Sequence, residues 1–157
     1  HRMAWGSNYG AVGNASVTAF GKTFSGYPSV SYAVMLTVGE HSKNTTLEAA
    51  KNIEHSVGAQ VAATLGSTPT WNPAFAAWDV TTSSNQANVS LSPKAGAIAA
   101  PTFRFLNYSA SSITQVTLNG QGLTADADYF ATVDSETQTL WLTLHGTVKQ
   151  SIDLHIE

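Results

Sequence analysis

The sequence predicts an all-β domain, an antiparallel β-sandwich of the jelly-roll or immunoglobulin-like type, with at most one short helix. Residues 114–157 read almost without a break as antiparallel β-structure. Within them, residues 148–157 alternate apolar and polar side chains, apart from Gln150 among the apolar positions, which is the period of a strand with one buried face. About nine or ten short strand patterns follow one another along the chain, separated by turn-forming residues. Helical spacing of apolar residues is favoured in one segment only, around residues 45–55.

The first predicted strands cover residues 15–20 and 29–38. The second pattern is the stronger, because alternate apolar residues share one face: Val30, Tyr32, Val34, Leu36 and Val38. Gly26 and Pro28 indicate a turn just before it.

Residues 44–66 fit either a helix or a strand. Thr45 and Glu48 form a capping-box pattern, and apolar residues at helical spacing follow them up to Gly66. Gly58 interrupts this pattern, and residues 57–65 also alternate as a strand would. Of the two interpretations we favour a short helix over about residues 45–55 and then a strand over about residues 57–65.

A loop over residues 66–73, which carries Trp71, leads into the rest of the predicted sandwich. Three further strands are expected near residues 74–81, 88–92 and 101–107, and about three or four more follow to the C-terminus.

The last strands are separated by turns at Asn119-Gly120 and at residues 134–136. In the strand pattern at residues 140–145, three residues share one face: Leu140, Leu142 and Leu144. Trp141 lies on the other face. A large indole there indicates either a surface that stacks on sugars or a strand covered by a second layer.

Length and composition favour one domain over residues 1–157, with residues 1–3 as a candidate tag remnant. A net charge of −3 without a basic stripe argues against nucleic acid as a partner. No apolar run approaches the ~20 residues that cross a bilayer, so no membrane partner is expected. The absence of cysteine excludes disulfides, thiolate zinc sites and thiol nucleophiles. Low charge with abundant Ser, Thr, Asn, Gly and aromatic residues favours an extracellular, secreted protein.

The C-terminal third contains the run Val116-Thr117-Leu118-Asn119-Gly120-Gln121-Gly122-Leu123-Thr124, then Asp128-Tyr129 and residues 140–144. This pattern resembles the end of immunoglobulin-like or jelly-roll modules that are appended to secreted polysaccharide-degrading enzymes. The resemblance implies an accessory, carbohydrate-binding module with covalent neighbour domains, as in a glycoside hydrolase or a polysaccharide lyase. It transfers no residue role, because the motif describes a hairpin and a buried tyrosine more than it describes a ligand.

Aromatic residues are the candidate ligand-binding residues, because sugar rings pack their C–H faces on aromatic rings. Trp71 in its predicted loop and Trp141 on an outward strand face are the favoured platforms, and Trp5 with Tyr9 forms a third candidate. Trp78 alternates with apolar residues and is equally explained by the core. We therefore expect a non-catalytic module that binds a polysaccharide through exposed aromatic side chains, with a β-glucan as the favoured ligand.

No catalytic machinery is recognisable, because the ten carboxylates form no motif pair and no nucleophile elbow or phosphate loop occurs. Copper-dependent polysaccharide oxidoreductases use an N-terminal histidine, so His1 with His41 or His55 defines an alternative function. Asp126 and Asp128 are candidate ligands of a structural calcium, and no other cofactor is expected. A further alternative is a structural or adhesive β-sandwich whose aromatic residues face a neighbouring domain.

Overall fold

The computed structural model describes residues 16–19, 22–25 and 43–157. The chain divides into two compact units, His1–Ala33 and Val34–Glu157, and each is described by itself. In the first unit, β1 (Ser16–Ala19) pairs antiparallel with β2 (Lys22–Ser25), and β1 lies within the first predicted strand. The strand predicted over residues 29–38 lies outside the described residues.

The second unit begins with α1 (Lys43–Val57), followed by β3 (Gln60–Leu65). The favoured interpretation of this segment, a helix and then a strand, is therefore confirmed. The helix ends where Gly58 donates its amide to the Glu54 carbonyl over 2.9 Å, and the Ala59 amide donates to the Ser56 carbonyl over 3.2 Å just before β3 begins.

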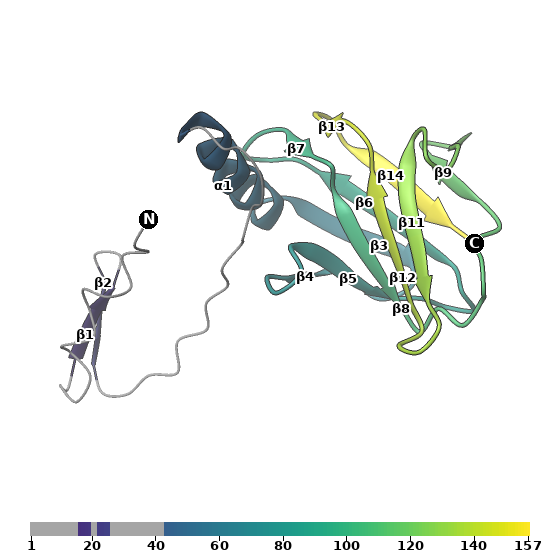
Figure 1. Cartoon of the computed structure of the whole chain (residues 1–157), viewed down its shortest axis with the longest axis horizontal. Coiled ribbons are helices and arrows are strands. Elements are labelled where there is room, and N and C mark those ends of the chain that lie inside the picture. The colour runs from purple at the N-terminus through teal and green to yellow at the C-terminus, as the bar shows by residue number, and fades with distance from the viewer. Residues whose placement is uncertain (1–15, 20–21, 26–42) are drawn as a thin grey trace. The chain divides into compact units, whose positions relative to one another are not determined.

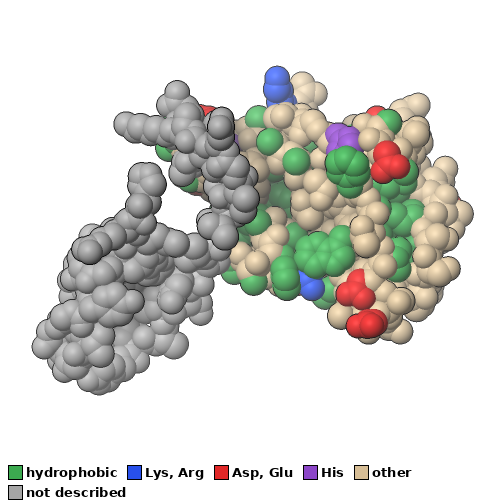
Figure 2. Space-filling view, viewed as in Figure 1, with side chains coloured by type: hydrophobic (Ala, Val, Ile, Leu, Met, Phe, Trp, Pro, Cys, Tyr) green, Lys and Arg blue, Asp and Glu red, His purple; other side chains and the backbone are tan. Residues whose placement is uncertain are grey.

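Ten strands of this unit form two five-stranded sheets. Sheet 1 has the order β11-β12-β8-β5-β4. Its strands are β11 (Tyr129–Asp134), β12 (Thr139–Leu144), β8 (Thr102–Leu106), β5 (Ala77–Thr81) and β4 (Thr70–Asn72). Sheet 2 has the order β10-β9-β14-β6-β3. Beside β3, its strands are β10 (Gln121–Gly122), β9 (Val116–Leu118), β14 (Ile152–Ile156) and β6 (Ala87–Ser92). A small pair joins β7 (Ile98–Ala99) to β13 (Thr147–Val148). Figure 1 shows the two layers, and Figure 2 shows the outer face of sheet 1 in the same orientation.

The described strands confirm the all-β sandwich, with one difference in strand direction. β5 and β8 run parallel, whereas the other named strand pairs among the described residues are antiparallel. The predicted antiparallel sandwich thus contains one parallel pair. A parallel neighbour needs a long crossover, and here β6 and β7 lie between the two strands in the chain.

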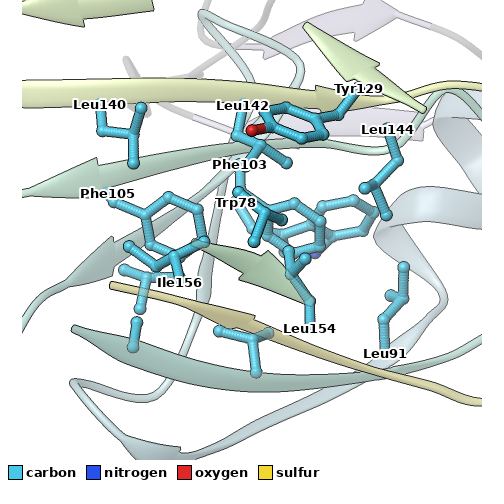
Figure 3. Packing of buried hydrophobic residues seen from close by; sticks show 14 of the residues in the cluster. Trp78, Leu91, Phe103, Phe105, Tyr129, Leu140, Leu142, Leu144, Leu154 and Ile156 are labelled. Atoms are coloured by element: carbon cyan, nitrogen blue, oxygen red, sulfur yellow. The ribbon is translucent and has the colours of Figure 1, made fainter. Parts of the chain in front are cut away.

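The core lies between the two sheets, where alternate residues of each strand point inward. Figure 3 shows side chains from both layers converging on the space between them. The largest fully buried core residues come from both sheets, from β7 and from one connecting loop: Trp78, Phe103, Phe105, Leu140, Leu142, Leu91, Leu154, Ile156, Ile98 and Tyr108. Burial of Trp78 confirms the core interpretation of that residue, and Tyr129 is buried as well.

The end of the chain follows the predicted alternation but contains a break. Val148 and the apolar residues of β14 are buried, whereas residues 149–151 separate β13 from β14. Gln150, the residue that did not fit the apolar face, is exposed within this break. The turn at Asn119-Gly120 is confirmed between β9 and β10, where both residues have positive φ angles of 52° and 77°.

Helix α1 is attached to the β7 segment by polar contacts. The Asn52 side chain donates Nδ2 to the Ala99 carbonyl at 3.0 Å and accepts the Ala99 amide on Oδ1 at 2.7 Å. His55 places Nδ1 2.9 Å from the Ala97 carbonyl, and its ring covers Gly96, where a Cβ atom would collide with it. The helix therefore presents a polar face to the sandwich and leaves Leu47 and Val57 exposed.

Candidate aromatic binding surface

The outer face of sheet 1 carries a row of side chains that strand register brings together. Asp79 on β5 is the register partner of Arg104 on β8, and Arg104 is the partner of Trp141 on β12. Because their strand neighbours point into the core, these three side chains point outward. Exposed hydrophobic side chains gather over this face in Figure 2, with a basic side chain beside them.

Phe75 completes this surface from the turn between β4 and β5. Its side chain is 49% exposed, and its ring meets the Trp141 ring edge-on, with centroids 5.3 Å apart at 82°. The guanidinium carbon of Arg104 lies 3.9 Å from the Phe75 centroid and 4.8 Å from the Trp141 centroid. Arg104 thus makes cation–π contacts with both rings, and these contacts fix the rings relative to each other.

The charge of Arg104 is compensated within the same surface. Its Nη1 lies 3.0 Å and 3.2 Å from the two carboxylate oxygens of Asp79, and the two side chains are only 14% and 21% exposed. Asn72 donates Nδ2 to Asp79 over 2.8 Å, and its Oδ1 accepts the Ala74 amide in the turn that carries Phe75. We call Asn72, Phe75, Asp79, Arg104 and Trp141 the aromatic patch.

Hydroxyl groups flank the aromatic patch on the same face. Thr132 is the register partner of Trp141 on the β11 side, and Thr70 is the partner of Asp79 on the β4 side. Thr102 and Thr143 are partners in the adjacent row, with their Oγ1 atoms 3.0 Å apart. The surface therefore combines aromatic rings, a neutralised ion pair and hydroxyls, which is a combination suited to polyhydroxylated ligands.

Only part of the predicted set of binding residues lies on this surface. Trp141 does, and it is half-buried. Trp71 lies in strand β4, so its prediction as a loop residue is wrong. It is the register partner of Trp78 and packs on that core ring, which places Trp71 and Trp141 on opposite faces of sheet 1. Trp5 and Tyr9 lie outside the described residues.

Arg104, Asp79 and Phe75 were not among the predicted binding residues. For Arg104 a signal existed, because it alternates with Phe103 and Phe105 and must therefore point away from the core that they enter. The position of Phe75 carried no such signal, because a left-handed residue, Ala76 with φ 48°, separates it from β5.

The predicted metal ligands do not form a cluster in the part of the chain that the structure describes. There, no group of three or more His, Cys, Asp or Glu side chains is placed to hold a metal ion. Asp128 accepts the Thr124 amide at 2.8 Å, and Asp126 donates its amide to the Tyr129 carbonyl, so both belong to the turn before β11. Of the copper candidates, His55 packs against the β7 segment, and His1 and His41 lie outside the described residues.

A cavity of about 600 Å³ opens where the β9–β10 hairpin meets the segments around β13. Its walls include the apolar side chains of Leu118, Leu144 and Ile152 together with Asp128 and His145. One polar atom of each of these last two is used in the turn, since Oδ2 of Asp128 accepts the Thr124 amide and Nδ1 of His145 lies 2.8 Å from the Ala127 carbonyl. None of its described lining residues is Phe, Tyr or Trp, so the cavity offers no such ring for a sugar to stack on.

No protein-family model, curated protein or solved structure matches this chain. Among the residues that the structure describes, no helix combines the length and the apolarity needed to cross a bilayer. The chemistry of the aromatic patch is therefore the basis for a functional assignment.

Proposed function

We propose that this chain is a non-catalytic, secreted module that binds a polysaccharide, with a β-glucan as the favoured ligand, on the outer face of sheet 1. The observation that carries the proposal is the pair of Phe75 and Trp141, two adjacent rings on an outward face with Arg104 against both. Rings displayed in this way offer stacking surfaces to the C–H faces of sugars. A neighbouring catalytic domain of a polysaccharide-degrading enzyme is the covalent partner that we propose.

The charge of the patch favours a neutral polysaccharide over an acidic one. Asp79 compensates Arg104 at 3.0 Å, so an added ligand carboxylate would have to compete with a carboxylate that is already in place. Binding to the patch should accordingly depend little on ionic strength, because no net charge is exchanged.

The proposal is tested by polysaccharide affinity gels and calorimetry on the full chain, with mixed-linkage β-glucan, cellulose, xylan and chitin. Phe75→Ala and Trp141→Ala should each weaken binding to the recognised glucan by about 1–3 kcal/mol, the usual effect of removing an aromatic hot-spot residue. Val57→Ala is the control, because Val57 is an exposed apolar side chain, 57% accessible, that belongs to α1 and not to sheet 1.

Melting temperatures separate a binding role from a structural one. Phe75 is exposed, so Phe75→Ala should retain most of the wild-type stability and lose only its contacts with Arg104 and Trp141, about 1 kcal/mol each. If wild-type protein retains none of the four polysaccharides, the proposed function is wrong. If it binds one of them and both aromatic variants bind it equally well, the site lies elsewhere.

A further inference from the structure

A second aromatic pair stands on the same outer face of sheet 1, outside the aromatic patch. Phe130 on β11 is 57% exposed, and its ring contacts His145 just beyond the end of β12, with centroids 4.1 Å apart at 65°. The large hydrophobic side chains that are exposed in the described region comprise Leu47 and Val57 on α1, and Phe75 and Phe130 on this face. Half of them therefore belong to one side of one sheet.

The ring of Phe130 packs against an anchored partner. His145 places Nδ1 2.8 Å from the Ala127 carbonyl, and its own amide donates to the Asp128 carbonyl at 2.8 Å. A carbonyl can only accept, so Nδ1 carries the proton, and the buried Nε2 has no hydrogen-bond partner within the described residues. The imidazole is thus held by one hydrogen bond and its backbone by another, so the Phe130 ring packs against a positioned partner.

Strand register sets the spacing between this pair and the aromatic patch. Phe130 is the partner of Thr143, which follows Trp141 by two residues on the same face of β12. Diagonal neighbours of this kind are roughly 7–8 Å apart, so the two ring groups lie next to each other on this face. Thr143 and Thr102 continue the row of Phe130, which is adjacent to the row of Trp141 and Arg104.

We infer that Phe130 and His145 form a second subsite for the same polysaccharide chain, so that the module recognises an extended internal stretch and not a single terminal sugar. This inference rests on the proposed function of the aromatic patch. A polysaccharide is the occupant because the threonine hydroxyls lie beside both aromatic groups, and because the Asp79–Arg104 pair leaves little net charge for an acidic or basic partner.

Calorimetry with a length series of mixed-linkage β-glucan oligosaccharides, from the disaccharide to the hexasaccharide, tests the inference on the full chain. Wild-type affinity should rise with length and then level off once both subsites are filled. Phe130→Ala should bind the shortest oligosaccharides as wild type does, and it should bind the longest roughly tenfold more weakly. Trp141→Ala should lose affinity at every length, and Val57→Ala should lose none.

The outcomes separate this inference from the proposed function. If wild type binds no oligosaccharide or polysaccharide, the proposed function fails and the subsite fails with it. A different result rules out the second subsite alone. In that case wild type binds, Trp141→Ala does not, and the affinity of Phe130→Ala either equals that of wild type at every length or is reduced by the same factor at every length. Sedimentation of the same variants tests whether a second copy of this chain occupies the surface instead. If wild type is a dimer and Phe130→Ala is a monomer, this surface is an interface between copies and the inference is wrong.

Discussion

Trp71 and Trp78 are direct cross-strand partners on β4 and β5, and their ring centroids lie 5.0 Å apart at an angle of 70°. Trp78 is 2% exposed and stacks in turn on Phe103, at 5.3 Å. The half-buried Trp71 therefore covers the end of the aromatic core at the edge strand of sheet 1. This arrangement gives Trp71 a role in stability and leaves it no place beside Trp141.

We expect Trp71→Ala to destabilise the protein by about 2 kcal/mol, below the ~3–5 kcal/mol of a fully buried tryptophan, because the ring is only half-buried. Urea unfolding measures this loss. Trp71→Phe is the matched control and should recover most of it, since a smaller ring still packs edge-on against Trp78. Glucan binding below the unfolding transition should be unchanged in both variants; a selective loss of binding in Trp71→Ala would restore Trp71 as a platform.

The buried faces of the strands could be predicted because burial within a strand follows a local period. Alternation alone places Ile152, Leu154 and Ile156 on one face of β14, and all three are buried. The same period places Trp141 opposite Leu140 and Leu142, as observed. Predictions of this kind need only the residues of one strand.

The aromatic patch could not be predicted in full because its members come from four strands and a turn. The contact between Arg104 and Trp141 depends on the register of β8 against β12, and that between Arg104 and Asp79 on a parallel pair formed by a crossover. Register between distant strands is set by packing of the whole sandwich. Trp71 was misplaced for a similar reason, since β4 is a strand of three residues in a segment rich in Pro and Thr, where local signals favour a loop.

The Asp79–Arg104 pair should be a coupled unit in which each partner compensates the other. Asp79→Ala leaves a guanidinium that is only 14% exposed without its carboxylate, and Nε of Arg104 is already buried without a partner in the described part of the chain. We expect a loss of about 2–3 kcal/mol in the free energy of unfolding. Arg104→Met removes the positive charge but keeps a long side chain that can pack against the rings of Phe75 and Trp141.

A double-mutant cycle with Asp79→Ala and Arg104→Met measures this coupling by urea unfolding. The double variant should be more stable than the sum of the two single losses predicts, because neither charge remains unpaired. Additive losses, or a loss in Asp79→Ala no larger than the ~0.5 kcal/mol of an exposed pair, would contradict a coupled role.

The turn between β11 and β12 gives the stability of the protein an acid-sensitive contribution. Hydrogen bonds from the Thr137 side chain, at 2.6 Å to Oδ2, and from the Thr137 and Glu136 amides lower the pKa of the Asp134 carboxyl below its usual 3.8. A carboxyl whose pKa is lower in the folded protein contributes stability above its unfolded pKa, and this contribution is lost as the pH falls through the folded pKa.

Thr137→Ala removes the largest cause of the shift, so the pKa of Asp134 should rise toward its ordinary value, as carboxyl-carbon NMR titration would measure. Urea unfolding should then show Thr137→Ala less stable than wild type at neutral pH, and this difference should shrink as the pH falls through the pKa of Asp134 in folded wild type. Asp134→Asn controls for the titration itself and should remove this part of the pH dependence in both backgrounds. An unchanged pKa of Asp134 in Thr137→Ala would mean that the backbone amides alone hold the carboxylate.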